Sequence, residues 1–225
     1  MTRVLVVGAS GGTGRQLVVS ALARGHRVRA WSLRDGELPL SHPLLEHHTG
    51  DVRDARSAHD AMRGIEAVVC ALGSKDGLRP TDVCERGTRS IVSAMQGSGV
   101  RRLIALTSLG TTGKLGPVHE HVVYPALLRG IYDDKRAQEL CIRESGLSWT
   151  IVRPGRLTDA PDRRCLRAVI DGPLPGVLVS RAAVARFMLD QIASDAFVSM
   201  APYLVEPSIV PWHKVLTLGG DRRAV

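Results

Sequence analysis

The most constraining feature of this sequence is a glycine-rich turn behind an apolar run near its start. Residues 4–7 read VLVV, and the segment GASGGTG at 8–14 repeats glycine at every third position, at Gly8, Gly11 and Gly14. Glycine weakens regular structure, so its repetition behind a buried strand needs a physical reason. A tight turn, a close approach of backbone to a diphosphate and the packing of a helix against a strand each require one glycine. The segment therefore predicts a strand, a dinucleotide-binding turn and a helix in succession.

The start of the predicted helix suits phosphate groups. N–H groups at a helix N-terminus lack partners and carry a partial positive charge, so we expect Ser10, Gly12 and Thr13 to contact the phosphates together with the three spaced glycines. A P-loop is excluded because no Gly-Lys-Ser or Gly-Lys-Thr follows. A strand–helix turn that binds no ligand is the alternative.

Apolar runs and amphipathic segments alternate along the chain. Strands are predicted at 3–7, 27–31, 66–71, 102–107 and 148–153. Helices are predicted at 12–24, 54–63, 80–98 and 134–145, and after Ser180, which reads as an N-cap. Short runs at 44–48 and 176–180 predict edge strands. The alternation indicates an α/β fold, a doubly wound, mostly parallel, Rossmann-like sheet flanked by helices.

The chain is expected to form one domain. Its 225 residues are 44% hydrophobic and 23% charged, enough for a sizeable core, and no composition shift marks a second unit within residues 1–225. Irregular segments at about 109–131 and 155–175 follow predicted strand ends, where α/β sheets bind ligands, and predict the walls of a pocket. The segment 202–225 is a C-terminal extension that packs on the sheet, covers the pocket or joins a dimer.

The choice of dinucleotide depends on the end of the second predicted strand. An acid there would hold a ribose 2′-OH, and an arginine would accept a 2′-phosphate. Ser32 and Arg34 favour NADP(H) over NAD(H), with Arg15 as a second phosphate partner. Asp35 would favour NAD(H) if the strand ended one residue later, and a solvated Arg34 is the alternative for that residue.

The next two strand ends also carry candidate cofactor residues. Asp51, followed by Val52, suits the adenine amino group, or else serves as an N-cap for the next helix. Ala71, Leu72 and Gly73 end the following strand, where small residues leave room for a cofactor or simply form a turn.

Charge and cysteine content exclude several function classes. The net charge of +8 is spread along the chain without a basic block, and few aromatic residues are present to stack on bases, so we expect no nucleic-acid partner. The four cysteines show no ligand-like spacing and predict reduced, structural thiols. His119-Glu120-His121 lacks metal-site spacing, so no metal is expected. The surplus of arginine instead suits anionic small molecules.

The sequence also predicts a cytoplasmic protein without a membrane partner. No apolar run approaches the roughly 20 residues that span a bilayer. The first residues enter a strand at Val4 without the pattern of an export signal. A monomer or a homodimer is expected.

Longer segments resemble a known family. Three segments resemble the NAD(P)H-binding, NmrA-like group of atypical short-chain dehydrogenases/reductases. They are SGVRRLIALTSLG at 98–110, DDKRAQELCIRESGLSWTIVRPG at 133–155 and VSRAAVARFML at 179–189. The segment GSKDGLRPTDVCERGTRSIVSAM at 73–95 is especially similar to the biliverdin reductase B, or flavin reductase, type. The resemblance covers about residues 3–195. It implies a Rossmann-like domain and NADPH-dependent reduction of planar, conjugated acceptors.

The resemblance also implies roles for individual residues. Ser108 matches the active-site serine and Lys135 matches a lysine that holds the nicotinamide ribose. The segment that closes over the nicotinamide is Arg153, Pro154 and Gly155, and Thr107 joins the cofactor residues. A strand-end hydroxyl and a solvated helix lysine are the plain alternatives for Ser108 and Lys135. The expected acceptor-binding residues are Leu109, Gly110 and Arg156.

The tyrosine–lysine dyad of typical members is displaced. Tyr132 lies three residues before Lys135 instead of four, which rotates the phenol by about 100° on a continuous helix. If Asp133 were the N-cap, Tyr132 would precede the helix and escape that constraint. The tyrosine is also missing in the biliverdin reductase B type, so Tyr132 is either a proton donor or an ordinary packing residue.

These features predict hydride transfer from NADPH to a flat acceptor, with Ser108 hydrogen-bonding the acceptor or the carboxamide. Arg156, with Arg129, Arg163, Arg164 and Arg167, makes the pocket walls basic and favours an anionic acceptor, although scattered surface arginines explain the same pattern. A non-catalytic dinucleotide sensor is one alternative function. A ketoreductase, epimerase or dehydratase that uses the same cofactor is another.

Overall fold

Strands and helices alternate along the chain in the computed structural model, which describes residues 1–73, 81–112 and 129–207. The elements are β1 (Arg3–Val7), α1 (Gly12–Ala23), β2 (Arg27–Ser32), β3 (Leu45–Thr49), α2 (Ala55–Ala61), β4 (Ala67–Cys70), α3 (Val83–Ser98), β5 (Arg102–Leu106), the 3₁₀ helix η1 (Leu109–Thr112), α4 (Arg129–Arg143), β6 (Ser148–Pro154), β7 (Arg156–Thr158), β8 (Arg167–Val169), β9 (Leu178–Ser180), α5 (Arg181–Asp190) and β10 (Tyr203–Val205).

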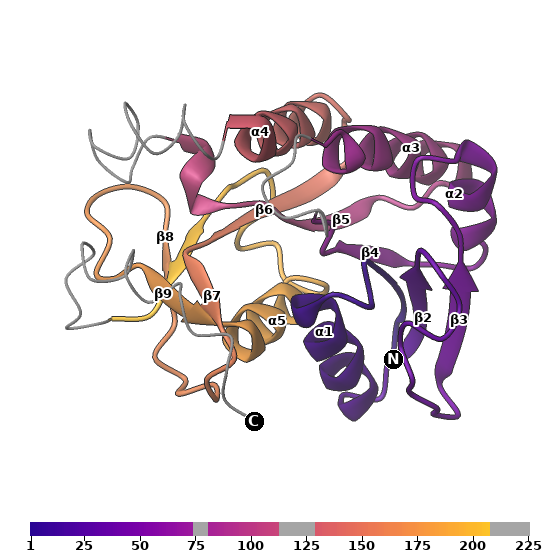
Figure 1. The fold of residues 1–225 in the computed structure, drawn as a ribbon, viewed down its shortest axis with the longest axis horizontal. Coiled ribbons are helices and arrows are strands. Elements are labelled where there is room, and N and C mark those ends of the chain that lie inside the picture. The colour runs from indigo at the N-terminus through magenta and orange to yellow at the C-terminus, as the bar shows by residue number, and fades with distance from the viewer. Residues whose placement is uncertain (74–80, 113–128, 208–225) are drawn as a thin grey trace.

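The main sheet has the strand order β3-β2-β1-β4-β5-β6-β10-β8 (Figure 1). Neighbouring strands are parallel except for β10 and β8, which are antiparallel. The chain runs outward from β1 in one direction and then in the other from β4, so the order reverses between these two strands. Such a switch point leaves a crevice at the carboxyl ends of the strands. This arrangement confirms the predicted doubly wound, Rossmann-like domain.

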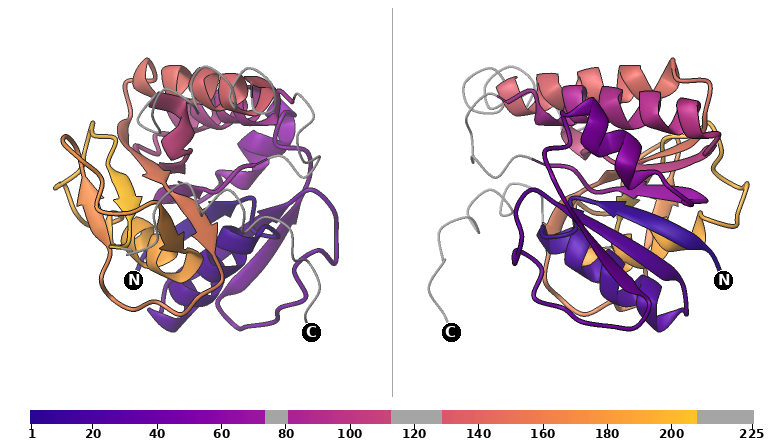
Figure 2. Two further views of the ribbon diagram at one scale, coloured as in Figure 1. Left: turned by 60° about the vertical axis from the view of Figure 1, so that its left-hand side comes forward. Right: turned by 90° about the vertical axis from the view of Figure 1, so that its right-hand side faces the viewer.

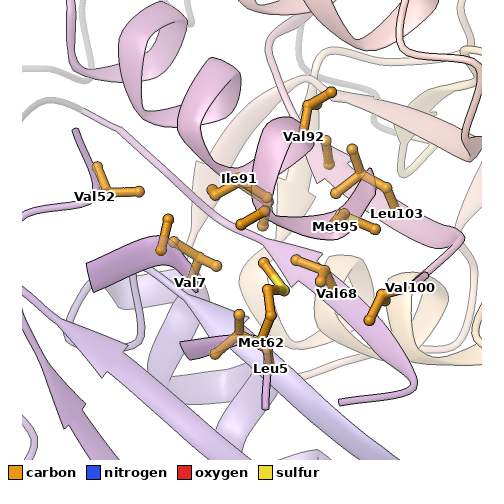
Figure 3. Packing of buried hydrophobic residues seen from close by; sticks show 14 of the residues in the cluster. Leu5, Val7, Val52, Met62, Val68, Ile91, Val92, Met95, Val100 and Leu103 are labelled. Atoms are coloured by element: carbon orange, nitrogen blue, oxygen red, sulfur yellow. The ribbon is translucent and has the colours of Figure 1, made fainter. Parts of the chain in front are cut away.

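Helices cover both faces of the sheet, as Figures 1 and 2 show. Side chains alternate between faces along a strand, so Val4 and Val6 of β1 pack with α1 and α5, whereas Leu5 and Val7 pack with α2, α3 and α4. Figure 3 shows Leu5 and Val7 in the second of these clusters, together with Ile91 and Met95 of α3. Two buried layers therefore hold the strand ends in fixed positions.

Helix α4 differs from its prediction, because it begins at Arg129 and includes Tyr132. Asp133 is therefore not the N-cap, and the prediction that Tyr132 precedes the helix is wrong. The neighbouring Asp134 caps a different helix, since its carboxylate accepts hydrogen bonds from the backbone N–H groups of Cys84 at 3.0 Å and Glu85 at 2.8 Å, at the start of α3. Capping between helices leaves no pattern in the local sequence.

The strands of the C-terminal part also depart from expectation. β9 pairs with β7 in a separate two-stranded sheet, so the run at 176–180 is not an edge strand of the main sheet. β10 lies inside the main sheet between β6 and β8, so the predicted extension from 202 contributes a strand to the fold. Strands of three residues are too short for periodicity to reveal them. In the part of the chain that the structure describes, no helix combines the length and apolar character needed to cross a bilayer.

Candidate functional site

The glycine turn places its backbone against two strand ends. Gly8 has a φ of +74°, a conformation that favours glycine, and a side chain there would meet the carbonyl oxygen of Ala71 at 2.7 Å. The N–H groups of Gly8 and Ala9 donate to Trp31 O at 3.1 and 3.0 Å. A side chain at Gly14 would collide with the backbone of Gly8, so the first turn of α1 packs directly on the strand end. Both positions require glycine for the reasons that the motif predicts.

A cavity of about 840 Å³ opens at this turn and extends along the carboxyl ends of the central strands. The predicted residues that line it are Gly8, Ser10, Gly11, Gly12, Thr13, Ser32, Arg34, Asp51, Val52, Ala71, Leu72, Gly73, Thr107 and Lys135. Other predicted residues are not among those that line it, namely Gly14, Arg15, Ser108, Leu109, Gly110, Tyr132, Arg153, Pro154, Gly155 and Arg156. The geometry thus places most of the predicted cofactor residues and Lys135 along one cavity, whereas Gly14, Arg15, the segment from Arg153 to Gly155 and the remaining catalytic and acceptor residues are not among those that line it.

The region after β2 holds the groups that bear on cofactor choice. Arg34 is exposed and lines the cavity, whereas Asp35 accepts a hydrogen bond from the N–H of Gly36 at 3.0 Å and is not among the lining residues. Arg15 donates through Nε to Ser10 O at 3.0 Å and through Nη2 to Glu37 O at 2.6 Å. Arg15 therefore ties this loop to the glycine turn.

Sequence reasoning missed Glu37. Its carboxylate accepts a hydrogen bond from Ser10 Oγ at 3.0 Å, and the residue lines the cavity. Cofactor preference is predicted from the residues at the end of the second strand, and Glu37 lies beyond that end. It reaches the cavity because the loop after β2 folds back on the glycine turn. The negative charge of the Glu37 carboxylate would repel a 2′-phosphate bound on this side of the cavity.

An ion-pair network between the end of β3 and the start of α3 also borders the cavity. Arg53 donates to Asp51 Oδ2 at 2.7 Å and to Asp82 Oδ1 at 3.4 Å, and all three residues line the cavity. The hydrogen bond from Arg53 lowers the pKa of Asp51. Trp31 also lines the cavity, with Nε1 donating to Gly50 O at 2.9 Å.

Lys135 links the ends of β4 and β5. Its Nζ donates to Leu72 O at 2.6 Å, to Leu106 O at 3.1 Å and to Gln138 Oε1 at 3.0 Å, and Gln138 donates in turn to Thr88 Oγ1 at 3.1 Å. A lysine ammonium has three N–H donors, so all of them are engaged. Lys135 is buried, which excludes the alternative of a solvated helix lysine, whereas its contact with the nicotinamide ribose stays a prediction.

A second buried network stands behind β5 and β6. Glu139 accepts hydrogen bonds from Thr107 Oγ1 at 2.8 Å and Thr111 Oγ1 at 3.1 Å, and from Arg153 through Nε at 3.0 Å and Nη2 at 2.5 Å. Arg153 also donates to Tyr203 Oη at 3.3 Å. Burial opposes ionisation of Glu139, but the hydrogen bonds and charge of Arg153, with the two threonine hydroxyls, outweigh it and lower the pKa. Arg153 and Thr107 thus direct their polar atoms toward Glu139.

The predicted catalytic serine and tyrosine both lie beside Gly110 of η1. Ser108 Oγ accepts a hydrogen bond from the N–H of Gly110 at 3.3 Å, and a side chain at Gly110 would collide with the phenol ring of Tyr132. The ring therefore lies against the Gly110 backbone, and Leu109 beside it is buried. The structure brings these four residues together, whereas their chemical roles stay predictions.

The segment after β6 is held by backbone contacts. The N–H of Gly155 donates to Leu204 O at 2.9 Å, and the N–H of Arg156 donates to Val177 O at 2.7 Å. The side chains of Arg156, Arg163, Arg164 and Arg167 are exposed. The side chain of Arg129 lies outside the described residues, as does His119-Glu120-His121. Among the side chains that the structure describes, no cluster of His, Cys, Asp or Glu is arranged to hold a metal ion.

The four cysteines form no disulfide. Cys70 and Cys84 are buried, and burial raises the pKa of the Cys70 thiol to about 11. A thiol with such a pKa is almost entirely protonated at neutral pH, which makes it a poor nucleophile.

A comparison with protein families matches residues 8–195 to a model described as NAD(P)H-binding. A curated relative is the sterol demethylase protein B of Methylococcus capsulatus, which is 34% identical over 173 residues and covers 71% of this chain and 53% of its own length. The chain spans between 52% and 62% of the lengths of the first curated relatives that it matches.

Solved structures share the fold over almost the whole chain. A short-chain dehydrogenase/reductase from Veillonella parvula in complex with NADP has a TM-score of 0.78 at 21% identity, covering 92% of this chain and 95% of its own. An anaerobilin reductase from Escherichia coli O157:H7 also has a TM-score of 0.78, at 23% identity, covering 93% of this chain and 100% of its own. At these identities the likeness shows the fold.

Proposed function

The chain belongs to the NAD(P)H-binding family, within the NmrA-like group of atypical short-chain dehydrogenases/reductases, and we propose that it is an NADPH-dependent reductase of planar, conjugated small molecules such as flavins, bilins or quinones. A bound NADPH supplies the hydride for such a reduction. The described residues fit the cofactor, because the glycine turn and the uncapped start of α1 line a cavity of about 840 Å³ that follows the strand ends. The chain then has to hold the dinucleotide and position the acceptor.

The arrangement of Lys135 carries the proposal. Reduction of an isolated carbonyl needs an acid for the developing alkoxide, commonly a tyrosine whose pKa a lysine lowers. Lys135 already donates all its N–H groups to Leu72, Leu106 and Gln138, and Tyr132 lies against Gly110. A flavin or bilin delocalises the added charge and takes its proton from solvent or a weak donor. The site therefore suits acceptors that need no strong acid.

Similar proteins support the same acceptor class. The Escherichia coli protein of the same fold is named for reduction of a bilin, and residues 73–95 resemble the biliverdin reductase B type. The exposed Arg156 and Arg163 follow β6 but are not among the residues that line the cavity, and we propose that they attract an acceptor with carboxylates or phosphate toward it. A matched pair of flavins tests this charge preference. We expect flavin mononucleotide to be reduced with higher kcat/KM than riboflavin, and equal values contradict the anionic preference.

Steady-state oxidation of NADPH, with flavin mononucleotide, biliverdin and a small quinone as acceptors, tests the reductase itself. We expect turnover with at least one acceptor and a reduced kcat in Ser108→Ala at unchanged cofactor affinity. Tight binding of NADPH without turnover on any acceptor contradicts the proposal and favours a dinucleotide sensor. Turnover restricted to non-conjugated ketones and abolished in Tyr132→Phe favours a ketoreductase or epimerase instead.

A further inference from the structure

The side chain of Arg181 lies against Gly12, a glycine that the spaced motif does not account for. Gly12 is not one of the three spaced glycines, yet a side chain there would meet Nε of Arg181 at 2.8 Å and Cδ at 3.0 Å. Arg181 is the first residue of α5, and Ser180 before it caps that helix by accepting a hydrogen bond from the N–H of Ala183 at 3.2 Å. The space above Gly12 is therefore occupied by an arginine from a segment more than 160 residues away in sequence.

Two positively charged features meet at this point. Arg181 lines the same cavity as Gly11, Gly12 and Thr13, whose N–H groups belong to the start of α1. That helix has no side-chain cap and no acidic residue in its first turn. A helix N-terminus carries a partial positive charge, and a guanidinium beside it adds a full one. An anion between them would be attracted by both and would accept charge-assisted hydrogen bonds.

The partner of Arg181 in this structure is easily replaced. Nη1 of Arg181 lies 2.7 Å from Oδ1 of Asp159, and the side chain of Asp159 is 88% exposed whereas that of Arg181 is 26% exposed. An ion pair with such an exposed carboxylate contributes little, because water screens it. A diphosphate offers two charges and several oxygen acceptors in place of one carboxylate, so it competes favourably for the same guanidinium.

We propose that Arg181 binds the diphosphate of the dinucleotide and exchanges Asp159 for it, so that α5 and α1 hold the cofactor from two sides. The inference rests on the dinucleotide site of the proposed function, but it does not depend on the acceptor or on turnover. Because NADPH and NADH share the diphosphate, Arg181 strengthens binding of both.

Equilibrium binding, followed by the fluorescence of the reduced nicotinamide, tests this assignment. We expect Arg181→Gln to weaken NADPH and NADH alike, by about tenfold, as the loss of a partly exposed charge-assisted contact implies. In competition with bound NADPH, ADP, which contains a diphosphate, loses more affinity in this variant than AMP, which does not. Asp159→Asn removes the competing carboxylate, so it tightens binding of both dinucleotides several-fold.

Arg186 provides the matched control. It lies on the same helix and pairs through Nε with Oδ2 of Asp162 at 2.5 Å, in the same loop that carries Asp159, but it is not among the residues that line the cavity. Arg186→Gln therefore loosens the loop without touching the diphosphate, and we expect unchanged dissociation constants.

Four results would overturn the inference. They are unchanged binding in Arg181→Gln, an equal loss in Arg186→Gln, an equal loss for AMP and ADP, and weaker binding in Asp159→Asn. A wild-type protein that binds neither dinucleotide overturns the proposed function together with the inference. Binding without turnover contradicts the reductase alone.

Discussion

Polar groups are arranged differently in two regions along the carboxyl ends of the strands. Around the glycine turn, after β1 and β2, backbone N–H groups and exposed side chains such as Arg34 face the cavity. Behind β5 and β6, the polar atoms of Thr107, Glu139 and Arg153 are directed toward one another and are largely withdrawn from water. The first region is arranged to receive a ligand. The second region holds the strand ends together.

This difference separates two kinds of variant. A substitution near the turn changes ligand affinity and leaves the free energy of unfolding nearly constant, because the affected groups are exposed. A substitution in the buried network changes the free energy of unfolding, because it leaves charged or polar partners without compensation. Lys135 belongs to both regions, because it lines the cavity and is also buried. A substitution there is therefore expected to affect both the site and the free energy of unfolding.

Arg153→Met should have the largest effect. The side chains of Arg153 and Glu139 are 12% and 8% exposed, and removal of one partner of such a buried pair costs about 3–5 kcal/mol. We expect urea unfolding to show a loss of this size, with NADPH affinity of the folded protein unchanged. The double variant Glu139→Met/Arg153→Met should recover part of the loss because no charge is left unpaired. A single variant as stable as the wild type would contradict the structural role.

Lys135→Met comes next. It removes the donor to Leu72 O, Leu106 O and Gln138 Oε1, and buried acceptors without a partner cost about 2 kcal/mol in total, since some solvent reaches them from the cavity. We therefore expect lower stability in urea unfolding together with lower kcat. If Lys135 only held the nicotinamide ribose, stability would equal that of the wild type and KM for NADPH alone would rise.

The same comparison explains which parts of the site could be predicted from sequence. The turn depends on backbone conformation, and glycine spacing records that conformation directly, as Gly8 with its φ of +74° shows. The central strands and the placement of α1 follow from local periodicity and were predicted nearly to the residue, with β1 at Arg3–Val7 and α1 beginning at Gly12. These features are local, so one sequence suffices.

The buried network depends on pairings that no local pattern contains. The ion pair between the guanidinium of Arg153 and Glu139 on α4 is one such pairing, and the resemblance that singles out the segment from Arg153 to Gly155 does not indicate it. Glu37 and Arg181 were missed because a loop and a helix bring them to the turn from elsewhere in the chain. Side-chain partners at this distance become visible only when the fold is known.

Arg34→Ala should affect binding and not stability. Arg34 is exposed and lines the cavity, so we expect about tenfold weaker binding of NADPH, unchanged binding of NADH and an unchanged unfolding midpoint. Glu37→Gln provides a variant of opposite sign, because it removes a carboxylate from the same side of the cavity and should tighten NADPH binding. Equal losses for both dinucleotides in Arg34→Ala would contradict a 2′-phosphate contact.

The pH dependence of stability should give the smallest effect, because protonation alters Glu139 without removing it. The folded protein lowers the pKa of Glu139, so above the unfolded value of about 4.3 the carboxylate is ionised in both states and its contribution is complete. As the pH falls below this value, the unfolded chain binds a proton first, and stability decreases by at most about 1.4 kcal/mol per pH unit for this group. Arg153 and the hydroxyls of Thr107 and Thr111 face the carboxylate, and their hydrogen bonds weaken when it is neutral.

Urea unfolding of the wild type and Glu139→Gln between pH 7 and pH 3 should therefore show a stability difference that narrows toward low pH. A difference that stays constant over this range would mean that the pKa of Glu139 is the same in the folded and unfolded states, and it would contradict the lowered pKa.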